Sequence, residues 1–460
     1  MRNAALAYAE SQRDAFLTQL FDFLRIPSVS TQPAHRPDIE RAARWLADHM
    51  RAIGLTRAEV LPTAGHPVVY GEWLEAGPQA ETILIYGHYD VQPPDPLDQW
   101  LSPPFEPQVR DDNLYARGAA DDKGQLFIHL KAVESYLKGA GRLPVNVKFI
   151  LEGEEESGSG GLEAFVRAER DRLQATAILV SDSPMPSPQQ PALLYALRGL
   201  TYMEVTVQGP DHDLHSGSYG GAVRNPAEAL CGVLARLKDE EGHITIPGFY
   251  DRVRPLEAEE REALARLPFT EARFLQETGV PAPWGEAGYT VLEQITARPT
   301  LEINGLVSGY TGPGSKTIIP ATAAAKISMR LVPDQDPEEI ARLFTEHVAR
   351  LMPPQVRATI ETRHTAWPVL IDRHASAMEA AARALEAVFG APPVYTREGG
   401  TIPIVATFQR QLGAPVVLMG FGLPDDNLHA PNEKFHLPNF YRGIAASIHF
   451  LAEMGALRTG

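Results

Sequence analysis

The sequence predicts an α/β fold whose sheet is at least partly parallel and whose chain is interrupted by a second, α+β domain. Apolar runs typical of buried strands alternate with stretches in which apolar residues recur every three or four positions, the period of an amphipathic helix. In the middle of the chain apolar and polar residues alternate instead, which favours a sheet with one exposed face. The chain of 460 residues also exceeds the length at which one hydrophobic core stops growing.

Four apolar runs are expected to be buried strands of the α/β sheet. They are 82–86 (TILIY), 145–151 (VNVKFIL), 177–180 (AILV) and, far downstream, 416–419 (VVLM). Helix-period stretches lie between or beside them, at 39–53, 126–137, 162–173 and 374–389. Strands that alternate with helices in this way indicate parallel pairing.

The middle of the chain predicts a different domain. Period-two alternation occurs at 201–208, in parts of 323–331 and at 357–362, accompanied by helix-like stretches at 225–238 and 337–351. The simplest partition places residues 1–196 and 369–460 in the α/β domain and 197–368 in the inserted domain. The Pro-rich segment 184–191 is typical of a boundary loop, and two domains in tandem are the alternative.

Charge and cysteine content narrow the class of protein. The 58 acidic residues outnumber the 42 Lys and Arg residues, which argues against nucleic acid or an anionic membrane surface as the main partner. The N-terminal stretch is a poor secretory signal, and no run of 18 apolar residues occurs. The single cysteine, Cys231, excludes internal disulfides and thiolate metal cages, so we expect a cytoplasmic protein whose metal ligands are His, Asp and Glu.

Acidic residues and histidines follow all four predicted strands. Because the carboxyl ends of parallel strands meet at one edge of a sheet, these side chains can converge although they are far apart in the chain. They are His88 and Asp90 after the first strand, Glu154, Glu155 and Glu156 after the second, Asp182 after the third, and His429 beyond the fourth.

Each of these features alone also has an ordinary explanation. Asp121 and Asp122 precede a helix and can simply cap it, and a run of three glutamates is usually a solvated face. Together with the histidines they favour a site for two divalent cations, which would polarise a carbonyl and lower the pKa of bound water. Asp90 lies on the same strand face as His88 and can orient its imidazole.

Nine stretches, in order along the chain, resemble the M20 family of co-catalytic metallopeptidases, and within it the dipeptidase branch. They are YGHYDVQP (86–93), LYARGAADDKG (114–124), LEGEEESGSGG (151–161), VSDSP (180–184), LRGLTYMEVTVQGPDHDLHSGSYGG (197–221), NGLVSGYTGPGSKTIIP (304–320), ISMRLVP (327–333), REGGTIP (397–403) and DDNLHAPNEK (425–434).

The resemblance implies a role for each residue of the predicted metal site. His88 and Asp182 would bind one metal, Glu156 and His429 the other, Asp121 would bridge them, and Asp90 would support His88. Glu155 would be the general base, because the pattern Glu-Glu-Ser-Gly aligns it, rather than Glu154, with that position. A cis peptide bond is expected between Asp121 and Asp122. The two divalent ions would be Zn²⁺ or Mn²⁺, with Co²⁺ also suited to these ligands.

The resemblance also makes the inserted domain a lid and dimerisation domain. His215 would reach the active site of the partner in a homodimer and stabilise the oxyanion. Thr317, Arg330, Gly400 and Thr401 are implied to contact substrate, since Arg330 suits a carboxylate and the Gly400–Thr401 turn can offer backbone N–H groups.

The function expected from these observations is hydrolysis of the peptide bond of dipeptides or short peptides by a metal-bridging hydroxide, with Glu155 as general base. An amidohydrolase for N-acyl amino acids, a desuccinylase or a carboxypeptidase of the same superfamily is the alternative. The alternative outside the enzymes is a non-catalytic dimeric protein that binds peptides or amino acids. The side-chain preference for substrate stays open.

Overall fold

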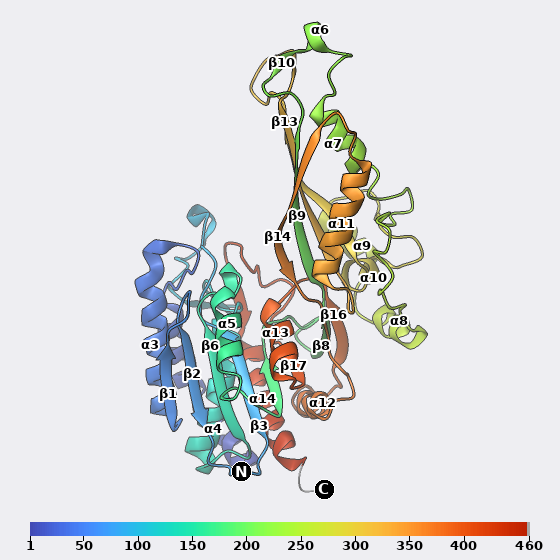
Figure 1. Cartoon of the computed structure of the whole chain (residues 1–460). Helices are drawn as coiled ribbons and strands as arrows, with labels where there is room; N and C mark the ends of the chain where they lie inside the picture. The colour runs from blue at the N-terminus through green and yellow to red at the C-terminus, as the bar shows by residue number, and fades with distance from the viewer. Residues whose placement is uncertain (458–460) are drawn as a thin grey trace. The chain divides into compact units, whose positions relative to one another are not determined.

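The computed structural model describes residues 1–457, which form two compact units (Figure 1). The first unit contains Met1–Tyr195, Ile371–Thr396 and the chain from Pro403 onward, and the second contains Ala196–Leu370 and Arg397–Ile402. The second unit is thus an insertion in the first. The partition predicted from the sequence differs from these units in three places, because it leaves Ala196, 369–370 and 397–402 in the α/β domain. Hydrogen bonds from Arg198 to Gly399 O and from Thr401 to Arg198 O attach the segment 397–402 to the second unit.

A mixed sheet forms the centre of the first unit. β3 pairs in parallel with β6 and β7, and β7 with β17, whereas β1, β2 and β6 pair antiparallel. The strand order is β1-β2-β6-β3-β7-β17-β8-β15, and β16 also pairs with β8. The strands are β1 (Arg57–Leu61), β2 (Val68–Trp73), β3 (Thr82–His88), β6 (Asn146–Glu152), β7 (Ala177–Val180), β8 (Ala192–Leu197), β15 (Val369–Leu370), β16 (Val394–Glu398) and β17 (Val416–Leu418). The predicted α/β class and its partly parallel sheet are confirmed.

Helices pack around this sheet, and α4 is the most deeply buried of them. Every residue from Lys123 to Tyr136 in α4 is buried, and the helix packs against β3, α1, α2 and α14. The helices are α1 (Arg2–Ser11), α2 (Arg13–Leu24), α3 (Arg36–Ile53), α4 (Lys123–Ala140), α5 (Gly160–Ala168), α12 (Ser376–Phe389), α13 (Pro403–Leu412) and α14 (Leu437–Ala456), with 3-10 turns η1 (Pro33–His35), η2 (Leu97–Gln99) and η3 (Glu155–Ser157). A small sheet adds β4 (Gln108–Arg110), β5 (Asn113–Tyr115) and β18 (Lys434–His436).

The second unit is built on an antiparallel sheet in the order β11-β13-β9-β14. Burial alternates residue by residue along β9, as the period-two pattern predicts, and α7 and α11 pack over the buried face. A short two-stranded antiparallel sheet, β10–β12, lies with α6 at one end of the unit (Figure 1). The elements are β9 (Gly199–Gln208), β10 (Leu214–His215), β11 (Thr300–Ser308), β12 (Ile318–Ile319), β13 (Thr322–Leu331), β14 (Arg357–Ala366), β15 (Val369–Leu370), α6 (Ser216–Tyr219), α7 (Pro226–Leu234), α8 (Ala258–Ala265), α9 (Glu271–Thr278), α10 (Val291–Thr296) and α11 (Pro337–Leu351).

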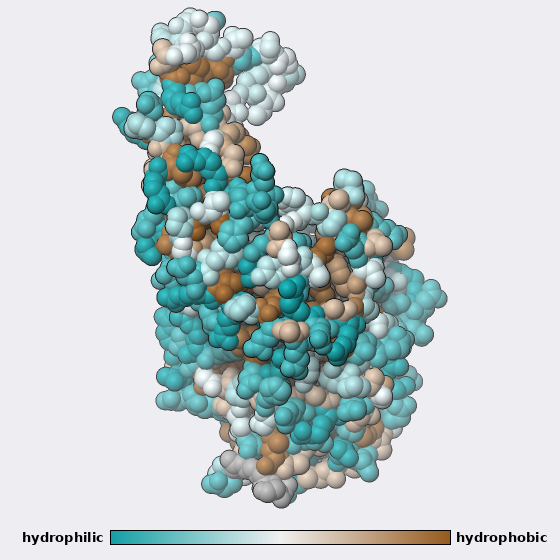
Figure 2. Space-filling model, turned by 90° about the vertical axis from the view of Figure 1, so that its right-hand side faces the viewer, coloured by the Kyte–Doolittle hydropathy of each residue, from teal (hydrophilic) through white to brown (hydrophobic). Residues whose placement is uncertain are grey.

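The surface agrees with the acidic, polar composition. Hydrophilic side chains cover most of the face drawn in Figure 2, and apolar side chains appear there in small patches. Among residues 1–457, none of the helices combines the length and the hydrophobicity needed to span a bilayer.

Candidate metal centre

Two groups of potential metal ligands in the first unit share one carboxylate. His88, Asp121 and Asp182 form one group, and Asp121, Glu156 and His429 form the other; within each group one ligand atom per residue lies within 4.8 Å of the others. The two oxygens of Asp121 face different histidines. Oδ1 lies 3.1 Å from His88 Nε2, and Oδ2 lies 2.9 Å from His429 Nε2. The structure thus brings together the five side chains that the sequence nominates as ligands.

The fold explains this convergence. In the parallel pairs, His88 lies opposite Glu152 and Tyr86 lies opposite Val180, so β3, β6 and β7 end at the same edge of the sheet. The ligands lie at or just beyond these ends: His88 closes β3, Glu156 lies in η3 after β6, Asp182 follows β7, Asp121 precedes α4, and His429 lies in the loop between β17 and β18. The expected cis peptide bond between Asp121 and Asp122 is present.

His88 has the surroundings of a metal ligand. Its side chain is fully buried, and in the described part of the chain Nε2 makes no hydrogen bond of acceptable geometry, although it lies 3.1 Å from Asp121 Oδ1 and 3.8 Å from Asp182 Oδ2. A buried polar atom without a partner is costly in a folded protein. The ring's other nitrogen, Nδ1, lies 3.4 Å from Asp90 Oδ1 and 3.1 Å from Asp90 O. Such an imidazole, held at one nitrogen and open at the other, fits a cation between itself and the carboxylates.

Asp90 also has a second contact that the sequence does not reveal. Its two carboxylate oxygens accept hydrogen bonds from the backbone N–H groups of Glu155 (3.2 Å) and Glu156 (3.1 Å). The same residue therefore fixes the ring of His88 and the turn that carries both glutamates. Gln92 continues the alternation of His88 and Asp90 along the chain, and its Nε2 donates to Glu156 Oε2 at 2.7 Å. This alternation is the signal that could have identified Gln92.

The three consecutive glutamates have different surroundings. Glu154 accepts hydrogen bonds from the backbone N–H groups of His66 and Gly161, so it is held away from the ligand groups. Burial raises the pKa of Glu155 to about 9, and the neighbouring charges of Asp182 and Glu156 contribute. This pattern agrees with the alignment that leaves Glu155 and Glu156, rather than Glu154, for the site.

The electrostatics of the cluster fit bound cations. Burial, with the charges of Asp121 and Glu156, raises the pKa of Asp182 to about 7. Hydrogen bonds to Asp121 and Glu156 raise the pKa of His429 to about 10. Several carboxylates thus share a buried space that favours positive charge beside them, and divalent cations would supply that charge. With oxygen and imidazole nitrogen as donors, Zn²⁺, Mn²⁺ and Co²⁺ are all suitable.

The remaining predicted residues lie in the second unit, in two groups. His215 closes β10 and Thr317 directly precedes β12 in the two-stranded β10–β12 sheet, where Ser216 N donates to Thr317 O at 3.0 Å. Arg330 Nη1 donates to Thr401 Oγ1 at 2.9 Å, and Gly400 precedes Thr401 in the returning segment. Arg330 lies at the end of β13 that is far from the β10–β12 sheet, so the structure places these two groups at opposite ends of that strand.

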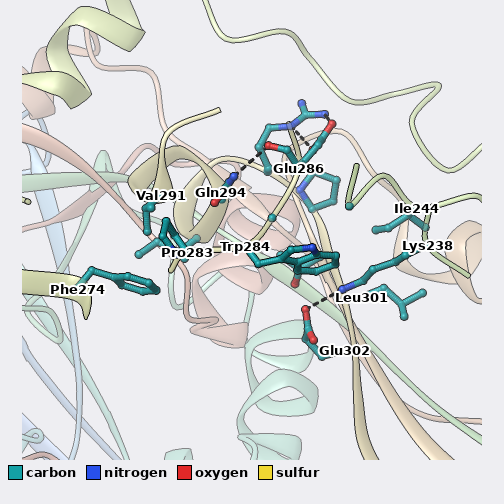
Figure 3. Close-up of a pocket in the computed structure, with 16 residues that line it drawn as sticks. Lys238, Ile244, Phe274, Pro283, Trp284, Glu286, Val291, Gln294, Leu301 and Glu302 are labelled. Atoms are coloured by element: carbon teal, nitrogen blue, oxygen red, sulfur yellow. Dashed lines mark hydrogen bonds and ion pairs between the residues drawn. The ribbon is translucent and has the colours of Figure 1, made fainter. Parts of the chain in front are cut away.

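A separate pocket in the second unit lies away from all these residues. It is drawn in Figure 3, where Lys238 lies beside the ring of Trp284 and donates to Glu302. Its walls are mainly apolar, with Ile244 and Leu301 among them. Among the described residues that line this pocket, none is a predicted site residue. The pocket is therefore not part of the metal centre.

Comparison with known proteins agrees with the geometry. The model of peptidase family M20/M25/M40 matches residues 84–453. A Cys-Gly metallodipeptidase of Schizosaccharomyces pombe is 32% identical over 97% of this chain and 97% of its own length. The human Beta-Ala-His dipeptidase is 33% identical over 98% of this chain and 92% of its own. The structure of an M20 metallo-carboxypeptidase from Sulfolobus solfataricus superposes with a TM-score of 0.84 and 33% identity, covering 96% of this chain and 99% of that one. The chain therefore belongs to peptidase family M20/M25/M40 and is a metallopeptidase.

Proposed function

We propose that this metallopeptidase hydrolyses the peptide bond of dipeptides at a centre of two divalent cations. The observation that carries the proposal is the carboxylate of Asp121, which belongs to both ligand groups. His88 and Asp182 would complete one cation site, and Glu156 and His429 the other. The similarity to dipeptidases over nearly the whole chain supports the substrate class.

The protein's own groups would divide the chemistry as follows. Bound divalent cations supply Lewis acidity to a carbonyl oxygen and lower the pKa of water. Glu155 would take a proton from the attacking water and return it to the leaving amine; its position in a buried, negatively charged cluster favours proton uptake. Asp90 would keep His88 and the Glu155 turn in place through the contacts described above.

Arg330 and its neighbours would bind the carboxylate end of the substrate. Burial lowers the pKa of Arg330, which means that its charge lies in a partly desolvated place where an anionic partner stabilises it. Its known contact is the hydroxyl of Thr401, which leaves other donors of the guanidinium for a carboxylate. Gly400 and Thr401 would add backbone N–H groups, and Thr317 would contact substrate from beside the β10–β12 sheet.

We further propose a cytoplasmic homodimer in which His215 acts on the site of the partner subunit. His215 Nδ1 accepts a hydrogen bond from Gly217 N at 3.0 Å, so the proton of a neutral ring would be on Nε2, ready to donate to an oxyanion. Three apolar side chains, Ile303, Leu306 and Val307, are exposed on β11, which is an edge strand of the same unit. Exposed apolar edges of this kind are where strands of another subunit pair. The single cysteine supports a reducing compartment.

A screen of the metal-reconstituted enzyme tests the proposal. Zn²⁺ and Mn²⁺ would each be supplied, with Co²⁺ as a third arm, and unblocked dipeptides would be compared with N-acetyl and N-succinyl amino acids and with N-blocked tripeptides. We expect the unblocked dipeptides to be hydrolysed fastest. Faster hydrolysis of acylated amino acids would identify an amidohydrolase or desuccinylase, and release of the last residue from N-blocked tripeptides a carboxypeptidase. Binding of dipeptides without hydrolysis under all metals would identify a non-catalytic binder.

A further inference from the structure

Glu433 is a fully buried carboxylate beneath the Asp121 loop, and the sequence does not single it out. One oxygen accepts hydrogen bonds from Ala120 N at 2.9 Å and Asp121 N at 3.1 Å. The other accepts from Gly118 N and from Arg117 Nη1, both at 2.8 Å. The carboxylate therefore holds the backbone of the loop that carries the shared ligand of both metal groups.

The same contact reaches the loop that carries His429. Arg117 Nη2 donates to Ala430 O at 3.2 Å, one residue beyond His429, while Arg117 Nη1 binds Glu433. Three residues of this loop, Asn427, His429 and Asn432, have φ values of 55°, 60° and 62°. Side chains other than glycine adopt this left-handed region only when their surroundings enforce it. Arg117 holds this loop at the carbonyl of Ala430, next to His429.

We infer that Glu433 is a positioning residue of the metal centre, which sets the place of Asp121 directly and that of His429 through Arg117. The inference rests on the proposed roles of Asp121 and His429 as ligands. Groups that orient metal ligands from behind typically change metal affinity by about 10- to 100-fold when they are removed. Glu433 touches no predicted ligand side chain, so it acts through the backbone and through Arg117.

The carboxylate of Glu433 is matched to the groups around it. Each of its two oxygens accepts two hydrogen bonds, and all four donors are N–H groups. Both lone pairs of each oxygen are already directed at N–H donors, so a proton or an amide NH₂ at this position would displace one or more of them. Glutamine, with the same size and no charge, therefore disturbs the loop without opening a cavity.

Calorimetric titration of the metal-free protein with Mn²⁺ tests the inference, and it requires no substrate. We expect Glu433→Gln to bind Mn²⁺ about 10- to 100-fold more weakly than the wild type. The matched control is Glu134→Gln, which removes another buried carboxylate of the same unit, paired with Lys131 in α4 at 2.7 Å. The control should bind Mn²⁺ as the wild type does. In Glu433→Gln the concentration of Mn²⁺ needed for half-maximal activity should rise by the same factor, and kcat at saturating Mn²⁺ should recover.

A second measurement uses the wild-type protein and does not depend on the variant folding. Hydrogen exchange of peptides covering residues 117–122 should show slow exchange at the amides of Gly118, Ala120 and Asp121. Exchange at the rate of an open loop would overturn the inference. So would an unchanged Mn²⁺ affinity in Glu433→Gln, or an equal loss in Glu134→Gln. If instead the wild type binds Mn²⁺ but cleaves no dipeptide, the proposed function fails while the titration still decides the role of Glu433.

Discussion

Among single residues, Glu155 should matter most for turnover. Metal binding should not depend on it. The change Glu155→Ala removes the group that moves the proton and leaves the ligands and Asp90 in place. Loss of a general base typically costs about 10²- to 10⁴-fold, so kcat should fall by that order. Steady-state kinetics and metal analysis of the same sample measure both quantities. A metal-loaded Glu155→Ala protein with near-normal hydrolysis would refute the assignment.

Glu154 offers the control for this experiment, because it is the adjacent glutamate of the same run. Its carboxylate is held by the amides of His66 and Gly161, so Glu154→Gln should cost stability rather than turnover. The reverse ranking, with Glu154→Gln slow and Glu155→Ala active, would show that the alignment of the run is shifted by one residue.

Arg330 should affect substrate affinity rather than the chemical step. Arg330→Ala removes a charge-assisted hydrogen bond to the substrate carboxylate, and we expect KM for a dipeptide to rise about 10- to 100-fold with a smaller change in kcat. A dipeptide amide, which lacks that carboxylate, should be cleaved equally by the variant and the wild type. Arg363→Ala is the control, since Arg363 lies exposed on β14 and pairs with Glu204 and Glu361. An equal loss with the amide would show that Arg330 has another role.

Most of the metal-site residues that could be nominated from the sequence lie just after a predicted strand. His88 and Asp182 could be nominated because the chemistry of the site follows the carboxyl ends of β3 and β7. Glu433 could not, because it precedes a strand of three residues, β18, whose pairing with β5 has no periodic signal in the sequence. Its role follows only from the tertiary contact with the Asp121 loop.

Among the elements, α4 carries a histidine whose protonation should weaken folding. His129 is fully buried; its Nε2 lies 2.8 Å from Ser181 Oγ and its Nδ1 lies 3.1 Å from Ser447 Oγ. Ser181 Oγ donates to Met419 O, so the ring donates to Ser181 from Nε2 and accepts at Nδ1, which requires the neutral form. Burial accordingly lowers the pKa of His129 to about 3.

The direction of the pH dependence follows from this shift. Below the ordinary histidine pKa the unfolded chain binds a proton at this position and the folded protein does not, so stability falls as the pH decreases towards 3. Between pH 7 and pH 5 this one group should remove about 2 kcal/mol from the free energy of unfolding. Urea unfolding at pH 7 and pH 5 measures the free energy of unfolding. Between these two pH values His129→Gln should lose about 2 kcal/mol less of that free energy than the wild type does. An identical pH dependence in the variant would mean that His129 is protonated in the folded protein.

The predictions of helices and strands succeed where apolar residues recur with a regular period. They fail where tertiary contacts determine the end of an element or the unit to which a segment belongs. β3, β6, β7 and β17 lie where the apolar runs place them, and β9 shows the alternation expected. The helix expected over 225–238 ends at Leu234, and the segment 397–402 joins the second unit through Arg198. Neither outcome has a local cause, since both depend on what the segment meets in space.

At the scale of the whole molecule, the predicted functional residues divide between the two units. The ligand groups and Glu155 lie in the first, and His215 and Arg330 lie in the second. The sequence can indicate the insertion, because the period of its apolar residues changes and later returns. It cannot indicate whether His215 serves its own chain or another, because an exposed residue on a strand of two residues has no pattern that identifies its partner.

Mixing two inactive variants decides which chain His215 serves. His215→Ala and Glu155→Ala should each be nearly inactive alone. In a mixed dimer, the site that retains Glu155 would receive His215 of the partner subunit, so this site is complete while the other lacks both groups. Random reassortment makes about half of the dimers mixed, each with one working site of two, so the mixture should recover about a quarter of wild-type activity. No recovery after demonstrated subunit exchange would place His215 in the site of its own chain, and a wild-type protein that is fully active as a monomer would exclude the proposed dimer.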